Sequence, residues 1–494
     1  MNILAFDIGT SAIKTSLVSF SGQLIDSDSC SYGINSVNKN WAEQDPDEWW
    51  RGAQVSCRKL FERNPGLKKD IAVIGVCGHM MGCLPVDKKG AALRPAMIHS
   101  DTRAALETED IANMAGREAL YQRSGNILCA QSPISKILWL KRNEPGIYAR
   151  TARFLQSKDY LVSRLTGNIN VTDFSDASHA QLIDIHKKAY LTDIFTDLSL
   201  EADKFPDILK GTDVAGKTTE AAARELDIPS GIPVIAGGGD GACANVGAGI
   251  SAERGEVYCC MGTTAWVSYN SAGPVIDSKA RIFDIMSLDG CSFGVFGTMQ
   301  AAGKSVQWAQ QLFGFESGAA FDAEAALSKE GSGGLIFLPY LEGERSPIFD
   351  ANARGLFFNI SSAHQRADFA RSVLEGVAFA LNSILEVYRE QREISEVRVI
   401  GGGANSGIWM SILADVFNAD ILTPRENSSS ITSLGVALAA GVGIGVYKDL
   451  AAASAVIQVA RKNSPKKENT GLYMRAFEKY MRLYPQLKTL FTEA

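Results

Sequence analysis

Val234-Ile235-Ala236-Gly237-Gly238-Gly239-Asp240-Gly241-Ala242 is the stretch from which the organisation of this chain can be worked out. A short apolar segment leads into three glycines and one aspartate, near the middle of 494 residues. Glycines allow φ > 0 and a close approach of the backbone, so a ligand can come near the carboxylate of Asp240. The carboxyl end of a strand is where α/β proteins commonly bind ligands. The alternative is a tight turn with a solvated aspartate, and the rest of the chain has to decide between the two.

Length and composition indicate a globular protein with at least two domains. Apolar residues make up 46% of the chain, and the net charge of −6 comes without a long basic run, which argues against nucleic acid or a membrane surface as partner. The nine cysteines and five histidines show neither a disulfide frame nor zinc-ligand spacing. We find no export signal, and the longest apolar run, 435–447, is too short to cross a bilayer. We therefore expect a cytoplasmic protein, with a core helix in that run.

Apolar segments that end at glycine-rich turns predict a series of buried strands. They are residues 2–6, 14–20, 71–77, 233–236, 256–260, 265–269 and 397–400. A helix is expected to begin at Pro46 with Asp45 as its cap, and helical stretches are expected over 102–142 and 157–165.

The second half of the chain repeats the opening of the first. Asp7-Ile8-Gly9-Thr10-Ser11 joins two predicted strands, and Met261-Gly262-Thr263-Thr264 joins two more about half the chain later. A separation of this length is too long for a solenoid repeat and suggests two related α/β domains that face each other. Backbone N–H groups in such turns form concavities suited to phosphate, although a single Gly-Thr turn is usually an ordinary hairpin.

A third glycine loop, Gly401-Gly402-Gly403-Ala404-Asn405-Ser406, follows a predicted strand and precedes a predicted helix. This arrangement leaves room for a base or a phosphate against the backbone. It lacks the Gly-x-Gly-x-x-Gly spacing, and no acid follows to hold a ribose, so a dinucleotide site has little support.

One motif matches a P-loop and is rejected on its context. Residues 211–218, Gly-Thr-Asp-Val-Ala-Gly-Lys-Thr, fit the pattern, but the segment before them is polar and contains Pro206. A working P-loop leaves a buried strand. A P-loop NTPase is therefore kept only as a distant alternative.

Taken together, the three loops resemble the phosphate and adenosine loops of the sugar-kinase, actin and heat-shock ATPase superfamily. Within it, Pro133-x-x-Lys136-Ile137-x-Trp139-Leu140 and the segment 355–375 are similar to the two signatures of the FGGY carbohydrate kinases, with Gln131 and Asn359 off the usual pattern. Residues 41–50, 158–161, 237–240 and 338–347 look like those of xylulokinases. The likeness extends over essentially the whole chain.

The resemblance implies two ribonuclease-H-like domains around a cleft, which we place at 1–245 (sugar and first phosphate loop) and 246–494 (nucleotide). It implies transfer of phosphate from ATP to a terminal hydroxyl of a small sugar, most simply a ketopentose such as D-xylulose. Asp240 would accept the hydroxyl proton, and Asp7 would hold Mg²⁺, largely through water. The ATP-binding residues implied are Thr10, Ser11, Lys14, Gly262, Thr263, Thr264, Gly303, Gln307, Gly402, Gly403, Asn405 and Ser406. Lys14 can also be read as a solvated strand lysine.

The implied sugar pocket departs from the family pattern, and its residues are His79, Met80, Met81, Asp101, Asp240 and Gly241. Xylulokinases generally read Gly-Gln-Met-His-Gly where this chain has Gly78-His79-Met80-Met81-Gly82, and Asn where it has Gly241. Their Trp-Asn-Asp-x-Arg is His99-Ser100-Asp101-Thr102-Arg103 here. The loss of a polar contact to a hydroxyl costs about 1–3 kcal/mol if a group stays unpaired. Gluconate, another pentulose or a polyol are therefore alternative substrates. The oligomeric state is left open, a homodimer included.

Overall fold

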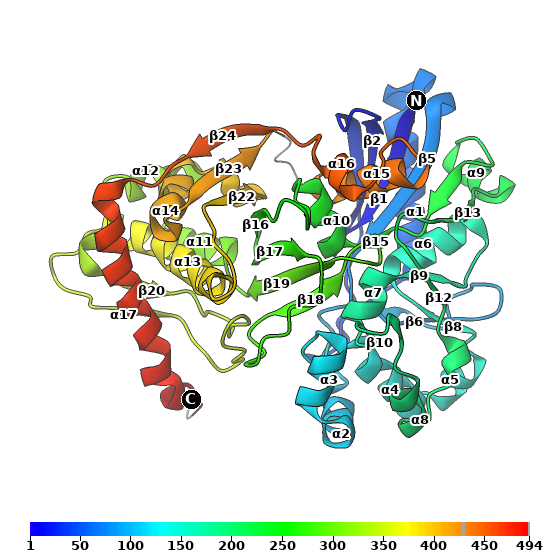
Figure 1. The fold of residues 1–494 in the computed structure, drawn as a ribbon, viewed down its shortest axis with the longest axis horizontal. Coiled ribbons are helices and arrows are strands. Elements are labelled where there is room, and N and C mark those ends of the chain that lie inside the picture. The colour runs from blue at the N-terminus through cyan, green and yellow to red at the C-terminus, as the bar shows by residue number, and fades with distance from the viewer. Residues whose placement is uncertain (426–429, 493–494) are drawn as a thin grey trace.

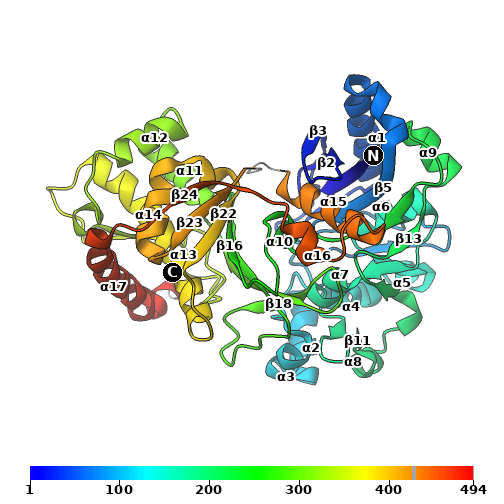
Figure 2. The ribbon, with the colours of Figure 1, turned by 45° about the horizontal axis from the view of Figure 1, so that its top comes forward.

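The computed structural model describes residues 1–425 and 430–492 as two α/β domains, each built on a mixed sheet (Figures 1 and 2). The first sheet has the order β13-β14-β5-β1-β2-β3, with β15 also paired to β5. Its strands are β1 Asn2–Ile8, β2 Ala12–Ser19, β3 Leu24–Ser31, β5 Ile71–Gly78, β13 Val214–Lys217, β14 Pro233–Ile235 and β15 Gly238–Gly239. The strands predicted from the apolar segments of the first half are confirmed.

The second sheet repeats the order and directions of the first. It runs β18-β19-β17-β16-β22-β23-β24. Its strands are β16 Val257–Met261, β17 Ala265–Ser271, β18 Phe283–Met286, β19 Phe293–Met299, β22 Glu396–Ile400, β23 Asp420–Pro424 and β24 Val459–Asn463. In each sheet an antiparallel hairpin, β1–β2 or β16–β17, lies beside a parallel strand, β5 or β22. The predicted duplication is therefore present in the topology.

The first sheet is buried on both faces, as the continuous apolar run in β1 requires. Leu4 and Phe6 pack under one layer of helices, while Ile3 and Ala5 face the opposite layer. The first layer contains α1 Pro46–Arg63, α6 Ser157–Thr166 and α9 Glu220–Leu226, and the opposite layer contains α10 Asp240–Gly247, α15 Ile431–Gly443 and α16 Leu450–Ser454. Asp45 caps α1 by accepting from Asp47 N at 3.0 Å, as predicted.

Helix α15 belongs to the second half of the chain and packs on the first sheet (Figure 1). Gly435 allows this because a Cβ there would lie 1.8 Å from Cys243 O of α10. The core helix predicted within 435–447 is thus present, shifted toward the N-terminus. The boundary predicted between residues 245 and 246 lies inside α10, and the chain passes between the two sheets three times: after α10, before α15 and after α16.

The second sheet packs under a separate set of helices. Its core includes α13, whose buried face carries Val373, Val377 and Leu381. The helices are α11 Gly303–Leu312, α12 Gly318–Ala325, α13 Arg366–Arg389, α14 Gly407–Phe417 and α17 Lys467–Thr492, and a small sheet joins β20 Ile336–Leu338 to β21 Leu356–Phe358.

A further group of short elements lies below the first sheet in Figure 1 and includes the loop 98–104. They are β4 Glu43–Gln44, β6 Leu84–Val86, β7 Ala96–Met97, α2 Ala105–Ala115, α3 Arg117–Ser124, α4 Pro133–Asn143, α5 Pro145–Arg150, β8 Arg153–Leu155, β9 Val171–Asp173, α7 Phe174–His179, β10 Ile183–Asp184, β11 Ala189–Tyr190, α8 Thr192–Asp197 and β12 Asp207–Leu209. This group has its own apolar core, with Ile137, Phe154 and Phe195.

The segment that matches a P-loop is an edge strand. Val214–Lys217 form β13, antiparallel to β14, and the following helix α9 begins only at Glu220 after Thr219 has capped it. No glycine loop wraps a helix N-terminus here, so the distant alternative of a P-loop NTPase is wrong.

Candidate active site

Asp240 stands where a glycine turn meets a helix. Gly237 has φ +72°, and a Cβ at this position would lie 1.9 Å from Val76 O of β5. Gly238 and Gly239 then pair with Cys77 and Gly78 of β5. Asp240 is the first residue of α10, and its Oδ1 accepts from Gly241 N at 2.8 Å. The predicted turn is therefore also a helix start, which the sequence alone did not reveal.

A chain of hydrogen bonds fixes this turn from below. Gly239 N donates to Ser175 Oγ at 2.9 Å, and Ser175 Oγ donates to Asp173 Oδ2 at 2.6 Å. Asp173 in turn lies 3.1 Å from the fully buried ammonium of Lys158, which also pairs with Asp159. The buried ion pairs of Lys158 are thus connected to the turn before Asp240 through Asp173, Ser175 and Gly239.

The carboxylates of Asp7 and Asp240 lie close enough to influence each other. Burial, together with a smaller contribution from the negative charge of Asp7, raises the pKa of Asp240 to about 7. Burial likewise raises the pKa of Asp7 to about 6, against the lowering effect of Lys14. Ser433 Oγ of α15 donates to Asp7 Oδ2 at 3.4 Å. Two acids with raised pKa values make this junction of the two domains a candidate functional site.

The β1–β2 hairpin carries the first predicted phosphate residues. Gly9 N donates to Ala12 O at 2.9 Å, which closes the turn, and Gln44 Nε2 donates to Thr10 O at 2.6 Å. Ser11 is exposed at the tip. Lys14 lies directly across the ladder from Asp7, which explains the electrostatic coupling of the two side chains.

The β16–β17 hairpin is the second predicted phosphate loop, and Gly262, Thr263 and Thr264 are all exposed at its tip. The start of α11 is bonded to it: Gly303 N donates to Gly262 O at 2.9 Å, and Lys304 N to Thr263 O at 3.0 Å. A Cβ on Gly303 would lie 2.5 Å from Gly262 O, so glycine permits this approach. Gln307 is exposed one turn further along α11.

The third loop joins β22 to α14. Gly401 has φ +89°, while a Cβ on Gly402 would meet no atom within 4 Å, which leaves open space over this residue. Asn405 is exposed, and Ser406 caps α14 by accepting from Trp409 N at 3.2 Å. Gly403 is enclosed, since a Cβ there would lie 2.8 Å from the Cβ of Met261.

The loop after β5 contacts the turn that carries Asp240. Met80 packs on Gly239, where a Cβ would lie 2.4 Å from the methyl group of Met80. Met81 adopts φ +61°. Its carbonyl oxygen accepts from Lys136 Nζ at 2.8 Å, and the same ammonium donates to Ile98 O at 2.7 Å. Lys136 therefore holds the two loops 78–82 and 98–103 side by side.

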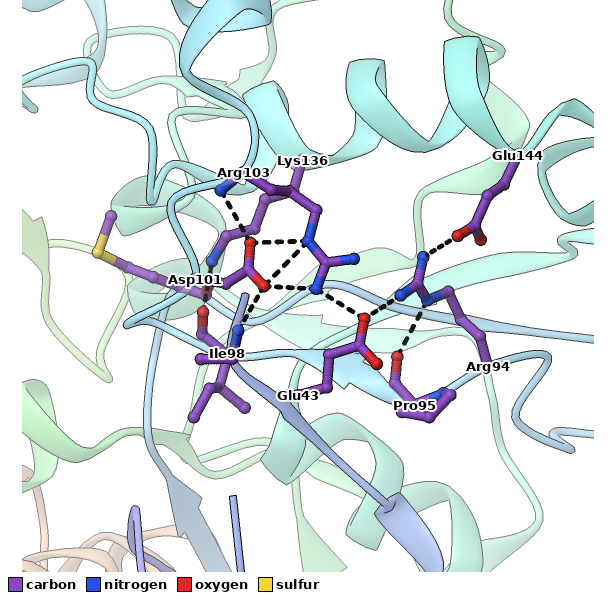
Figure 3. A network of polar contacts seen from close by, with 10 residues as sticks. Glu43, Arg94, Pro95, Ile98, Asp101, Arg103, Lys136 and Glu144 are labelled. Atoms are coloured by element: carbon purple, nitrogen blue, oxygen red, sulfur yellow. Dashed lines mark hydrogen bonds and ion pairs between the residues drawn. The ribbon is translucent and has the colours of Figure 1, made fainter. Parts of the chain in front are cut away.

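The carboxylate of Asp101 is engaged by neighbouring protein groups. It is fully buried and accepts from Ala42 N at 2.8 Å and from the Arg103 guanidinium at 2.6 Å (Figure 3). Arg103 also pairs with Glu43, which pairs with Arg94. The contact of Asp101 with substrate stays a prediction. The carboxylate is occupied by a buried ionic network that shapes the loop 98–103.

The described residues include no group of three or more His, Cys, Asp or Glu side chains able to hold a metal ion. Asp7 is a single carboxylate beside phosphate-type loops, which fits a Mg²⁺ ion that keeps most of its water and is bound largely through substrate phosphates. Within residues 1–425 and 430–492, no helix is long and apolar enough to span a membrane.

A two-domain α/β fold with paired hairpins around a shared acid site is that of the actin and sugar-kinase ATPases. Residues 2–247 match the FGGY family of carbohydrate kinases, N-terminal domain, and residues 257–444 match its C-terminal domain. The chain belongs to the FGGY family and is a carbohydrate kinase.

Individual relatives agree with this assignment. A xylulose kinase of Staphylococcus epidermidis is 33% identical over 99% of this chain and 97% of its own length. The solved gluconate kinase and the ligand-bound xylulose kinase, both from Lactobacillus acidophilus, each superpose with a TM-score of 0.93 at 26% identity, and each covers 100% of this chain and 99% of its own. The chain is similar to kinases of both substrates.

Proposed function

We propose that this chain transfers the γ-phosphoryl group of ATP to a terminal hydroxyl of a ketopentose such as D-xylulose. The observation that carries the proposal is the electrostatic coupling of Asp240 to Asp7 of the first phosphate-type hairpin and to Cys260 of the second. Its turn is bonded to Ser175 and contacts Met80. Similarity to xylulose kinases supports the choice of sugar.

Asp240 would accept the proton of the attacking hydroxyl. Phosphoryl transfer passes through a loose transition state, so catalysis consists mainly of positioning and charge neutralisation. The raised pKa of Asp240, about 7, makes its ionised form a competent base at neutral pH. Helix α10 begins at this residue, and its N-terminus favours the ionised carboxylate that accepts the proton. This effect is small because the helix has only eight residues.

The hairpin amides and hydroxyls would orient the phosphates from both domains. Thr10, Ser11 and Lys14 would act from the first domain, and Gly262, Thr263 and Thr264 from the second. Asp7 would hold Mg²⁺ through water, and that ion supplies neutralisation of phosphate charge when bound. The adenosine would lie against Gly402, Gly403, Asn405 and Ser406, with Gly303 and Gln307 nearby. The open space over Gly402 supports this placement.

An ADP-release assay across ketoses, polyols and aldonic acids tests the proposal, with Asp240→Ala as control. We expect a ketopentose to stimulate ADP release by the wild-type protein and not by the variant. No stimulation by any sugar, or an unchanged rate with Asp240→Ala, would overturn it. A second candidate acceptor is gluconate, because a gluconate kinase has the same fold over the full chain; the same panel decides between the two.

A further inference from the structure

The helix that begins with Asp240 ends against a largely buried arginine of the second sheet. Arg398 lies on β22, and its side chain is 13% exposed. Its Nη1 donates to Ala248 O at 3.0 Å and to Gly249 O at 2.7 Å, the carbonyl groups that follow the last turn of α10. Carbonyl groups at a helix C-terminus lack partners within the helix and attract positive charge. Arg398 therefore binds the end of α10 that is opposite to Asp240.

The backbone at Gly249 permits this contact. Gly249 has φ +78°, and a Cβ there would lie 2.1 Å from Arg398 Nη1. Any other residue at this position would displace the guanidinium and would also adopt a backbone conformation that L side chains rarely take. The approach of Arg398 to the end of α10 thus depends on the glycine.

Two further charged side chains complete the contact. Arg254 Nη2 donates to the same Gly249 O at 2.8 Å, and its Nη1 donates to Ala451 O of α16 at 3.1 Å. Glu256 pairs with both guanidinium groups, and its Oε1 lies 3.5 Å from Arg398 Nη2. The carboxylate offsets the repulsion between two positive charges that share one carbonyl oxygen. Arg254, Glu256 and Arg398 therefore form a charged cluster around the end of α10.

The strands that carry this cluster lead to the loops proposed to bind ATP. Glu256 directly precedes β16, and β16 leads to the hairpin tip 262–264. Arg398 is in β22, which runs parallel to β16 and leads to the loop 401–406. Helix α10 extends from the same cluster to Asp240. The proposed base and both nucleotide loops of the second domain thus lie at the far ends of elements that meet at this cluster.

Helix α10 is attached to the first domain by backbone packing and to the second sheet by side chains. A Cβ on Gly247 would lie 2.0 Å from Ile431 O of α15, so the two helix backbones are in close contact. Within α10, Asn245 Nδ2 donates to Asn270 Oδ1 of β17 at 2.6 Å. Arg398 supplies another polar attachment at the helix end. Two separated attachments fix the tilt of a helix relative to a sheet, whereas a single one leaves it free to pivot.

We propose that Arg398 is a positioning residue for phosphoryl transfer, which sets the tilt of α10 and thereby the distance from Asp240 to the hairpin tip 262–264. The inference rests on the proposed kinase function. Asp240 must face the acceptor hydroxyl while the hairpin orients the γ-phosphoryl group, and a misplacement of about 1 Å costs roughly 10²-fold in rate. Arg398 acts on the reaction only through α10.

The first test removes the guanidinium. In Arg398→Met we expect kcat to fall by about 10- to 100-fold, with KM for ATP and for the sugar within about 2-fold, because the loops that bind them are intact. Arg398→Lys keeps a cationic donor and should recover part of the loss. Arg392→Met is the matched control, since Arg392 donates to Gly255 O, beyond the end of α10, and kcat should stay within about 2-fold.

The outcomes of this test separate the inference from the kinase function. A kcat of Arg398→Met within about 2-fold of wild type, an equal loss in Arg392→Met, or a loss that appears in KM instead would overturn the inference. If no sugar stimulates ADP release by the wild-type protein, the proposed kinase function itself fails.

The second test asks whether Arg398 acts through Asp240. Arg398→Met is introduced into Asp240→Asn, and the residual turnover is measured at high enzyme concentration. A residue that positions the base has no further effect once the base is absent, so kcat of the double variant should lie within about 2-fold of that of Asp240→Asn. Equal losses in both backgrounds would show a general structural role and would overturn the inference.

A glycine variant keeps the test valid if Arg398→Met fails to fold. Gly249→Ala displaces the guanidinium but retains every charge, and kcat should fall by about 10-fold with both KM values kept. Gly231→Ala is the matched control, because Gly231 has φ +77° and a Cβ there would meet no atom within 4 Å. An unchanged kcat in Gly249→Ala, or an equal loss in Gly231→Ala, would overturn the role of Arg398.

Discussion

The β1–β2 and β16–β17 hairpins occupy equivalent places in their sheets, yet their chemistry differs. The first carries Asp7 two residues before its Gly-Thr turn, and the equivalent position in the second is Cys260. Burial and the charge of Asp240 raise the pKa of Cys260 to about 12, so this thiol is neutral. The charge of Asp7 thus acts on the pKa of Asp240, and the charge of Asp240 acts on the pKa of Cys260. Of the two equivalent positions, only Asp7 can bear a negative charge near neutral pH.

This asymmetry follows from the electrostatics of the site. Asp240 already has its pKa raised to about 7 with one acid nearby. A second carboxylate at position 260 would disfavour the ionised base further and would repel the phosphates. The duplicated fold therefore supplies two similar loops. Only the loop of the first domain has an acid at this position, Asp7, where the second has Cys260.

Removal of the shared acid should have the largest effect. In Asp240→Asn, kcat is expected to fall by roughly 10²–10⁴-fold, the usual contribution of a general base, because an amide cannot accept the proton. KM for ATP should stay within about 2-fold, since the nucleotide residues are on other loops. Steady-state kinetics measure both values. A kcat within 3-fold of wild type, roughly 0.6 kcal/mol, would remove Asp240 from the mechanism.

Substitutions at the two equivalent positions, Asp7 and Cys260, test most directly whether the two hairpins differ in function. Asp7→Asn should lower activity at limiting Mg²⁺ by a factor on the order of 10–100, as for other residues that hold a metal through water. The matched Cys260→Ser should change activity by less than about 2-fold. Mg²⁺ titrations of activity provide the measurement. Similar losses in both variants would mean that the hairpins are not specialised as described here.

The raised pKa values predict how activity depends on pH. Because the base must be ionised, kcat/KM should fall as the pH drops below about 7, by about 10-fold for each pH unit. The profile of kcat/KM from pH 5 to 9 tests this. A profile flat down to pH 5 would contradict the environment described for Asp240.

The same shifts predict how stability depends on pH. The pKa values of Asp7 and Asp240, about 6 and 7, lie above the usual 3.8, so the folded state binds more protons than the unfolded state between about pH 4 and 7. These groups therefore reduce the free energy of unfolding as the pH rises through that window. Asp240→Asn should have a higher Tm than wild type at pH 8, and the difference should shrink toward pH 4. A Tm difference independent of pH would contradict this linkage.

The loop 401–406, which we propose to hold the adenosine, contains two glycines whose substitution should have a smaller effect. Gly402→Leu places a side chain in open space and should raise KM for ATP by about 10-fold, with Tm unchanged. Gly403→Ala forces a Cβ against Met261 and should instead lower Tm. An unchanged KM in the first variant would place the adenosine elsewhere.

The smallest effect is expected at the rejected P-loop motif. Lys217 is exposed on the edge strand β13. Lys217→Ala should leave kcat within about 2-fold and stability within ±0.5 kcal/mol of wild type. Loss of nearly all turnover would restore the P-loop interpretation.

The sequence predicted those features that depend on local patterns. Apolar runs before glycine turns gave the strands, and the recurring Gly-Thr pairs gave the duplicated hairpins. Asn359, which stands where glycine is usual, adopts φ +70°, a left-handed conformation that asparagine tolerates better than most residues. These signals lie within a few residues and need no knowledge of tertiary contacts.

The features that the sequence did not predict depend on contacts between distant segments. The return of α15 to the first sheet brings Ser433 to Asp7, residues far apart in the chain. The burial of Asp101 by Arg103 and the clamp of Lys136 on two loops also appear only in three dimensions. Ser175, which holds Gly239, carries no motif of its own. Side-chain pairing over such separations is set by the completed fold.

The most direct test of the proposed mechanism is the product formed from ATP and D-xylulose, followed by phosphorus NMR. With the wild-type protein we expect one phosphate ester on a terminal CH₂ carbon for each ADP released, and with Asp240→Asn we expect neither product within the same time. Release of inorganic phosphate without a sugar ester, or full ester formation by Asp240→Asn, would contradict the role assigned to the acid between the two hairpins.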